Sequence, residues 1–82
     1  MELKDTCDMM VSSDYKDRFK AEFYQLLIRY KKLKSMVDNW DNLTFVPTCP
    51  KSVYKAQLEA MNKYILILRH RAELEGVVLE NI

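Results

Sequence analysis

The sequence predicts an all-α fold: an antiparallel helical hairpin with a structured, proline-containing connector, which assembles into an oligomeric helical bundle. Two long segments carry apolar residues at alternating steps of four and three, the spacing of one helix face. The chain has one glycine, and its two prolines, Pro47 and Pro50, lie close together between those segments. We expect one domain over residues 1–82. Because so short a chain buries a modest share of its surface alone, we also expect a partner copy.

The first helix is expected over about residues 13–40. Its main apolar stripe has steps of 4, 3, 4, 3 and 4 and consists of Phe19, Phe23, Leu26, Tyr30, Leu33 and Val37. Ser12 or Ser13 can supply the N-cap, and Asp14 and Asp17 place negative charge near the positive end of the helix dipole. The helix therefore has both a periodic face and a start signal.

The connector, about residues 41–49, is expected to be structured rather than a free linker. Asn and Asp turn formers precede Pro47, and Pro50 suits the first turn of the following helix. We expect Phe45 and Val46 to fold back onto the helix pair.

The second helix is expected over about residues 50–75, before Gly76, a residue type that favours the left-handed position after a helix. Its stripe repeats the same steps and consists of Tyr54, Leu58, Met61, Ile65, Leu68 and Ala72. The run YILILRHR, residues 64–71, resembles a buried strand by itself, but the surrounding periodicity makes it helical. Residues 76–82 are expected to dock as an extended tail.

Both helices carry more apolar surface than one partner helix covers. The surplus residues are Val53, Ala56, Ala60, Ile67 and Leu74 in the second helix and Tyr24, Leu27 and Ile28 in the first. Either the tails and connector cover them, or copies of the chain associate. We favour a homo-oligomer, because two helices alone rarely bury enough surface to offset chain entropy.

The net charge of +1 hides an uneven distribution. Residues 16–34 hold seven bases and two acids, residues 51–71 hold five bases and one acid, and the rest of the chain holds one base and nine acids. Basic helices with acidic ends favour a small anionic partner over a long polyanion, so nucleic acid is not an expected partner. No apolar run approaches the length of a membrane span, so no membrane partner is expected.

Polar residues follow the edges of both stripes. They are Arg18, Glu22, Gln25 and Arg29 in the first helix, and Gln57, Tyr64 and Arg71, seven apart, in the second. Guanidinium groups, amides and a phenol suit a phosphate with an attached base. The same side chains can instead form interhelical contacts, such as Arg18 with Glu22, that only fix helix register. The candidate ligand-binding residues are Arg18, Gln25, Arg29, Gln57, Tyr64 and Arg71.

Catalysis and metal binding find no support in the sequence, so we expect neither enzyme activity nor a cofactor. There is no glycine-rich phosphate loop, nucleophile elbow or spaced carboxylate pair, and His70 is placed on the polar side of its helix. Cys7 and Cys49 with one histidine cannot build a zinc site. A disulfide between them is possible on paper. Since charged residues rather than an apolar export segment follow Met1, we expect the cytoplasm and two free, buried thiols.

Two stretches, DYKDRFKAEFYQLLIRYKKLKSM and LTFVPTCPKSVYKAQLEAMNKYILILRHRAELEG, resemble small helical-hairpin proteins of phages and prophages, including the crAss-like phage group. More loosely, the Cys-Pro-x-Ser turn and helix between Cys49 and Arg71 look like the hairpin of phage sponges that oppose CBASS and Thoeris immunity. The resemblance covers about residues 14–76. It implies an oligomer in the bacterial host cytoplasm that sequesters a cyclic nucleotide or cyclic ADP-ribose-type signal between protomers without cleaving it.

The leading hypothesis is therefore a phage anti-defence protein that binds a small anionic nucleotide-type ligand. The hypothesis assigns phosphate binding to Arg18, Arg29 and Arg71. It assigns stacking on a base or ribose face to Tyr64, and hydrogen bonding to the polar edges of the ligand to Gln25 and Gln57. The alternative is a small helical protein–protein interaction module whose surplus apolar face binds a host or phage protein. The sequence leaves open the ligand, the subunit number, the roles of residues 1–12 and 77–82, and whether the arginine-lined edges form a pocket.

Overall fold

The structure, a computed structural model, describes residues 1–80; residues 81 and 82 of the expected tail lie outside the described part. Over residues 1–80 the chain is helical and has no strand. The elements in order are a 3-10 turn η1 (Leu3–Thr6), α1 (Cys7–Met10), α2 (Tyr15–Asp38), a 3-10 turn η2 (Trp40–Asn42) and α3 (Lys51–Glu75). The prediction of an all-helical fold is confirmed.

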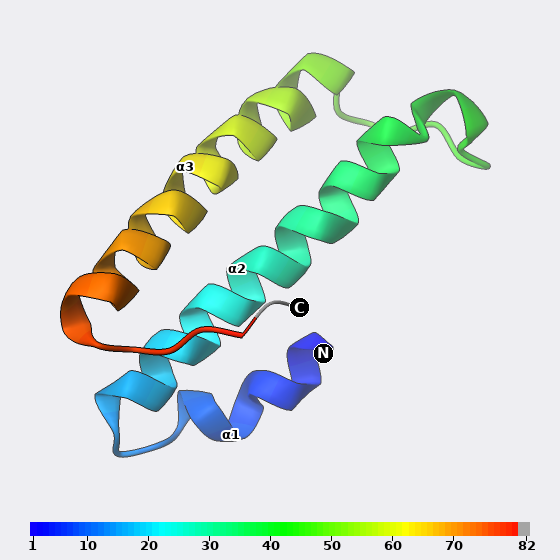
Figure 1. Ribbon diagram of the computed structural model, residues 1–82. Helices are drawn as coiled ribbons and strands as arrows, with labels where there is room; N and C mark the ends of the chain where they lie inside the picture. Colours follow the sequence, from blue (N-terminus) through cyan, green and yellow to red (C-terminus); the bar gives the residue numbers. More distant parts are fainter. Residues whose placement is uncertain (81–82) are drawn as a thin grey trace.

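The long helices α2 and α3 lie side by side and run in opposite directions (Figure 1). The molecule is elongated, with extents of 42 × 24 × 19 Å. The short N-terminal elements and the segment after α3 both lie against the N-terminal half of α2 (Figure 1). None of the helices within residues 1–80 is both long and apolar enough to cross a membrane.

Asp14 caps the start of α2, whereas the sequence had pointed to Ser12 or Ser13. The Asp14 carboxylate accepts a hydrogen bond from the backbone N–H of Lys16 at 2.9 Å. The Ser12 hydroxyl instead donates to the Asp17 carboxylate at 2.9 Å and accepts from the backbone N–H of Asp14 at 3.1 Å. The two polar groups thus share the unpaired donors of the first turn.

Gly76 ends α3 as the sequence predicted. It has φ +69°, in the left-handed region that glycine adopts without a Cβ clash. The backbone N–H of Val77 donates to the carbonyl of Ala72 at 2.9 Å, and the same carbonyl also accepts from the backbone N–H of Gly76. This turn sends the chain back toward α2.

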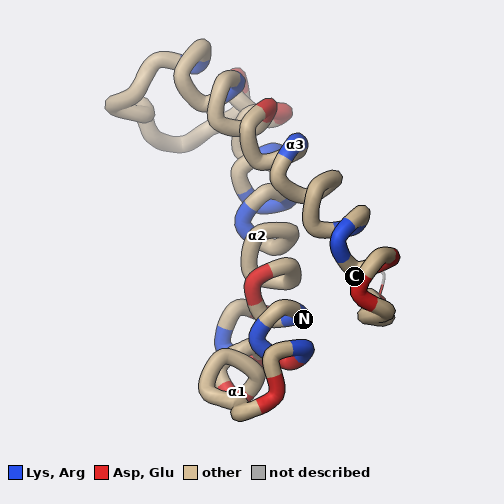
Figure 2. The backbone as a smooth tube through the Cα atoms, turned by 90° about the vertical axis from the view of Figure 1, so that its left-hand side faces the viewer, with Lys and Arg blue, Asp and Glu red and all other residues tan. Residues whose placement is uncertain are grey.

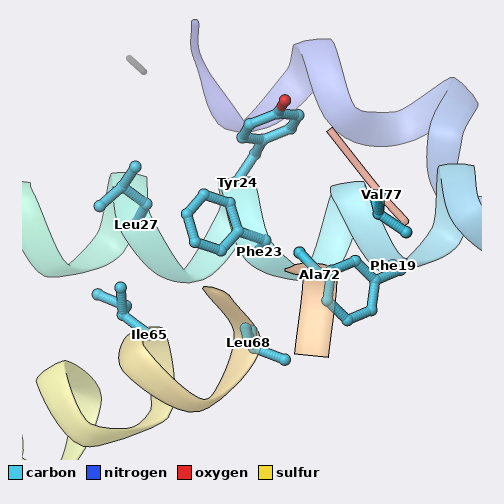
Figure 3. Close-up of a cluster of buried hydrophobic side chains, with 8 residues drawn as sticks. All are labelled: Phe19, Phe23, Tyr24, Leu27, Ile65, Leu68, Ala72 and Val77. Atoms are coloured by element: carbon cyan, nitrogen blue, oxygen red, sulfur yellow. The ribbon is translucent and has the colours of Figure 1, made fainter. Parts of the chain in front are cut away.

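One apolar cluster joins α2, α3 and the tail (Figure 3). Phe23 and Leu68 lie at its centre, with 0% and 1% of their surfaces exposed. The other buried members are Phe19, Tyr24, Leu27, Ile65, Ala72 and Val77. All buried residues of α3 thus belong to its C-terminal half, while Tyr54, Leu58 and Met61 toward the connector are half-buried.

The surplus apolar residues of α2 are covered within the chain, so the expectation that another copy covers them is wrong. Tyr24, Leu27 and Ile28 are buried. The Tyr24 hydroxyl accepts a hydrogen bond from the backbone N–H of Glu80 at 2.9 Å, and Leu79 packs against the core. The tail thus contacts Tyr24, whereas Leu27 belongs to the core cluster that α2 shares with α3.

The connector does not fold back as expected. Phe45 and Val46 are 56% and 93% exposed. The Trp40 ring packs against Tyr54 with centroids 5.9 Å apart, and the Lys51 ammonium lies 5.9 Å from the Trp40 ring centre. Because Trp40 rather than Phe45 closes this end of the helix pair, the tip of the connector is left in solvent.

Both thiols are free, but the expectation that they are buried is wrong for Cys7, which is exposed, while Cys49 is half-buried. Thr6 and Met9 are the side chains that face the rest of the molecule at the N-terminus: Thr6 is fully buried and Met9 packs against the core. Cys7 lies between them on the other side of the short α1 helix.

Candidate functional site

The two polar edges predicted from the sequence meet at Tyr64 and Glu22. The Tyr64 hydroxyl of α3 donates a hydrogen bond to the Glu22 carboxylate of α2. This bond, followed by partial burial and by the negative charge of Glu22, raises the pKa of Tyr64, while the positive charge of Arg71 opposes the rise. Tyr64 keeps 42% of its surface exposed. A ligand can therefore reach a phenol ring whose orientation is fixed.

Arg71 lies beside this pair and rests on the core. Its guanidinium carbon is 4.8 Å from the centre of the Phe19 ring, a cation–π contact. Its Nε donates to the Glu75 carboxylate at 3.0 Å. One of the five N–H donors of the guanidinium group is used in this ion pair, and the side chain is 47% exposed. Arg71 is thus held in place with its head accessible to an anion.

Arg69 is a cation that the sequence did not single out. Its guanidinium carbon lies 5.1 Å from the centre of the Phe23 ring. Arg69 and Arg71 flank the core stripe of α3 from its two sides, so both edges of the aromatic core carry a guanidinium group. The only sequence signal for Arg69 is its position next to Leu68 on the stripe.

Two other candidates are engaged in holding the fold. Arg18 donates to the carbonyl oxygen of Ser12 at 2.7 Å and does not pair with Glu22, the contact suggested from the sequence. Gln25 donates to the Thr6 hydroxyl at 2.9 Å. Both side chains thereby fasten the N-terminal segment to α2.

The last two candidates, Arg29 and Gln57, are exposed, one on each long helix. Figure 2 shows that Lys and Arg positions follow both long helices. Of the six candidates, Tyr64 and Arg71 lie on the same edge of α3, where the Arg71 charge acts on the Tyr64 phenol, and Glu22 accepts from Tyr64. Arg18 and Gln25 instead contact the N-terminal segment.

A hollow of about 460 Å³ lies at the connector, lined by Tyr54 and residues 45–50. None of these lining residues is charged. A phosphate would therefore find no cation among them, and this hollow does not coincide with Tyr64 and Arg71.

The surplus apolar face of α3, unlike that of α2, stays open. Val53, Ile67 and Leu74 are 51%, 59% and 74% exposed, and Ala56 and Ala60 are exposed as well. This face adjoins Tyr64 and Arg71, because residues three or four apart are neighbours on a helix surface. The cluster of Glu22, Tyr64 and Arg71 thus lies at the border of an uncovered apolar surface.

Ionisation of Tyr64 gives a test of this cluster. Its pKa is expected above the ordinary 10.0, because only the protonated phenol donates to Glu22. A raised folded-state pKa means that the stabilising contribution is complete below pH 10.0 and is lost as the pH rises through the folded-state value. The absorbance of phenolate, followed against pH in the unmodified protein and in Tyr64→Phe, identifies this tyrosine.

The matched control for that titration is Glu22→Gln, which removes the acceptor's charge and keeps its shape. The pKa of Tyr64 is expected to move down toward the ordinary value in this variant. An unchanged titration in Glu22→Gln would show that Glu22 does not hold the phenol.

Comparison with known protein families gives a match over most of the chain. A family model described as Sequestin matches residues 13–74. This span includes all of α2, the connector and every residue of α3 except the last, Glu75. No curated protein and no solved structure matches the chain. The matched span contains Glu22, Tyr64 and Arg71 and leaves out η1, α1 and the tail.

Proposed function

The chain belongs to the Sequestin family, and from this premise we propose that it sequesters a nucleotide-derived immune signal of a bacterial host without transforming it. The family description supports binding and holding of a molecule. The proposed ligand class is a cyclic nucleotide or a cyclic ADP-ribose-type molecule. The proposed setting is the bacterial cytoplasm, where the protein would act for a phage against this signal.

The observation that carries the choice of ligand is the cluster of Tyr64, Arg71 and Glu22 at the exposed edge of the helix pair. A guanidinium group binds phosphate through charge-assisted hydrogen bonds, and a phenol ring offers a face for stacking a base. The Glu22 carboxylate adds an acceptor for a ribose hydroxyl. These three groups together match a molecule that carries phosphate, sugar and base.

We place the ligand between protomers. The cluster is open in a single chain, and the apolar face beside it is uncovered, so a second copy would both bury that face and close over the ligand. In this arrangement Arg29 and Gln57, both exposed, are available to the ligand, whereas Arg18 and Gln25 keep their structural contacts.

Isothermal titration calorimetry with a panel of cyclic dinucleotides and cyclic ADP-ribose-type molecules tests the proposal. For the ligand that binds, Arg71→Ala is expected to weaken affinity by roughly 10- to 100-fold, because a hydrogen bond to a charged group contributes about 1.5–3 kcal/mol. The matched control is Lys55→Ala, which removes the same charge from an exposed position elsewhere on α3. Mass spectrometry after unfolding the complex should recover the ligand unchanged.

Three results would count against sequestration at this cluster: no binding by any member of the panel, equal losses in Arg71→Ala and Lys55→Ala, or recovery of a chemically altered ligand. Melting curves of both variants are needed, because Arg71 also contacts the Phe19 ring.

A second candidate function is a protein–protein interaction module, which the exposed connector favours. Phe45 and Val46 present apolar side chains beside the hollow of about 460 Å³. Exposed apolar patches next to a hollow are typical of contact sites for other proteins. Binding of a host or phage protein that Phe45→Ser abolishes, with no small molecule bound, would favour this candidate over sequestration.

A further inference from the structure

The exposed surface of α3 contains a row of apolar residues with a regular spacing. Val53, Ala60, Ile67 and Leu74 are each seven residues apart and all four are exposed. We call them the outer row. Residues seven apart lie on almost the same side of a helix, so the outer row runs for about 32 Å along α3. A seven-residue apolar repeat is the pattern by which one helix packs lengthwise against another.

The outer row is distinct from the residues that bind α2. Ile65, Leu68 and Ala72 are buried against α2, whereas Ile67 and Leu74 are 59% and 74% exposed. The helix therefore has two lengthwise apolar faces, and only one of them is covered by the described residues of the chain. A second helix is needed to cover the other apolar face.

Most of the residues beside the outer row are polar or positive, and Ala56 is the exception. Gln57, Tyr64 and Arg71 follow it on one side, and Ala56, Lys63 and His70 on the other. None of these ten positions is acidic. The surface thus combines an apolar centre with margins that are neutral near the connector and carry the cations Lys63 and Arg71 farther along the helix.

The geometry points to a second copy of this chain as the occupant of the outer face of α3, packed antiparallel so that Ala60 of each copy lies opposite Ile67 of the other. The same register places Val53 opposite Leu74. A two-fold axis between Lys63 and Tyr64 relates the copies, and the contact is isologous, which closes the assembly at two chains. This inference deepens the proposed function and rests on it for the nature of the ligand.

Side-chain size favours the antiparallel register. The outer row is small in its N-terminal half, Val53 and Ala60, and large in its C-terminal half, Ile67 and Leu74. Antiparallel packing sets a small residue against a large one at every layer, which keeps the helix axes evenly spaced. Parallel packing would set Ala60 against Ala60 and Leu74 against Leu74, so the helices would diverge. Opposed helix dipoles favour the same choice.

The margins of this contact explain why an anion belongs there. The two-fold axis brings Lys63 and Tyr64 of both copies within about one helical turn of each other, and Arg71 of each copy near Gln57 of the other. Lys63 of the two chains places two positive charges close to the axis, and Arg71 of each chain, although paired with its own Glu75, keeps four further N–H donors for an anion. A multiply charged anion between the copies removes the repulsion between the two Lys63 charges.

The size of the surface indicates a weak dimer in the absence of such an anion. About ten residues of each copy would take part, fewer than the roughly 20–30 residues per side of a standard stable interface. Association is therefore expected to depend on protein concentration. Inorganic pyrophosphate, as a simple multivalent anion, is expected to tighten the dimer by at least about tenfold.

Sedimentation equilibrium of two charge variants tests the surface. Ile67→Asp is expected to weaken dimerisation by roughly 30-fold or more, because it places a charge in the apolar layer. Leu66→Asp is the matched control: Leu66 is 58% exposed against 59% for Ile67, but it lies off the outer row. Leu66→Asp should leave dimerisation within about threefold of the unmodified protein. Circular dichroism checks that both variants remain helical.

Disulfide trapping tests the register. Two proteins are prepared with Cys7→Ser and Cys49→Ser, one carrying Ala60→Cys and the other Ile67→Cys. Facing residues bring Cα atoms within reach of a disulfide, about 4.4–6.8 Å, so oxidation of the mixture should give the mixed dimer in excess over either self-linked dimer. Self-linked dimers from each protein alone, with no preference for the mixed product, would overturn the antiparallel register.

The outcomes separate this inference from the proposed function. The α3 contact would be overturned if Ile67→Asp and Leu66→Asp had the same dimerisation constant and no dimer were trapped by oxidation. This conclusion would hold even if calorimetry showed a bound nucleotide. Trapping in the expected register without any nucleotide binding would overturn sequestration and leave the α3 contact standing.

Discussion

Phe23→Ala is expected to lower the free energy of unfolding by about 3–5 kcal/mol, the usual cost of truncating a buried phenylalanine. Phe23 has no exposed surface, and its ring packs edge-on against Tyr24 with centroids 5.6 Å apart. Arg69 covers it at 5.1 Å. A domain of 82 residues has a total stability of about 4–12 kcal/mol, so this one change removes a large share of it.

Urea unfolding followed by circular dichroism measures the effect, and Phe45→Ala is the matched control. Phe45 is 56% exposed in the connector, so its truncation is expected to cost about 1 kcal/mol or less. Equal losses in the two variants would mean that the cluster in Figure 3 is not the centre of the core.

Leu68→Ala is expected to destabilise the protein by about 2–5 kcal/mol, whereas Leu66→Ala is expected to cost about 0.5 kcal/mol or less. The two leucines are two positions apart on α3 and chemically identical, but Leu68 is 1% exposed and Leu66 is 58% exposed. Each variant makes the same substitution in the same helix, so the change in helix propensity is the same in both. A difference in the free energy of unfolding therefore reports the difference in burial.

The same urea experiment decides the outcome for these variants. If YILILRHR formed a strand, Leu66 and Leu68 would lie on one face, and the two substitutions would have similar costs. A large difference is expected only for the helical arrangement, in which the two side chains lie about 200° apart around the axis.

The helices were predictable because their signals are local. The steps of four and three along Phe19, Phe23 and Leu26 indicate the core face of α2 by themselves, and Gly76 indicates where α3 ends. The N-cap was harder, since Ser12, Ser13 and Asp14 are all good capping residues. Which of them caps depends on hydrogen bonds among Ser12, Asp14 and Asp17 that the order of residues does not reveal.

What covers each apolar face could not be read from periodicity. Tyr24 and Ile28 lie off the main apolar stripe of their helix, as Ile67 and Leu74 do, yet the first two are buried and the last two are exposed. The N-terminal helix α1 has only four residues, too few to show a period, and its place is set by tertiary contacts such as Gln25 to Thr6.

The sequence predicted which candidate residues share one edge of a helix, but it did not predict their hydrogen-bond partners. Helical spacing put Arg18, Glu22 and Gln25 on one edge of α2, and the structure gives each a different partner: the Ser12 carbonyl, the Tyr64 hydroxyl and the Thr6 hydroxyl. Two residues four apart can pair or can turn to groups elsewhere, and the choice depends on which segments pack nearby.

The concentration of buried residues in one half of the hairpin has a dynamic consequence. Near the chain ends, α3 is held by Ile65, Leu68 and Ala72 and by the docked tail, whereas near the connector it is held by half-buried side chains and the Trp40–Tyr54 contact. Local opening costs least where few apolar contacts break. Backbone amides of the first turns of α3 should therefore exchange with solvent before those of its last turns, and the hairpin should fray from its tip while its base stays closed.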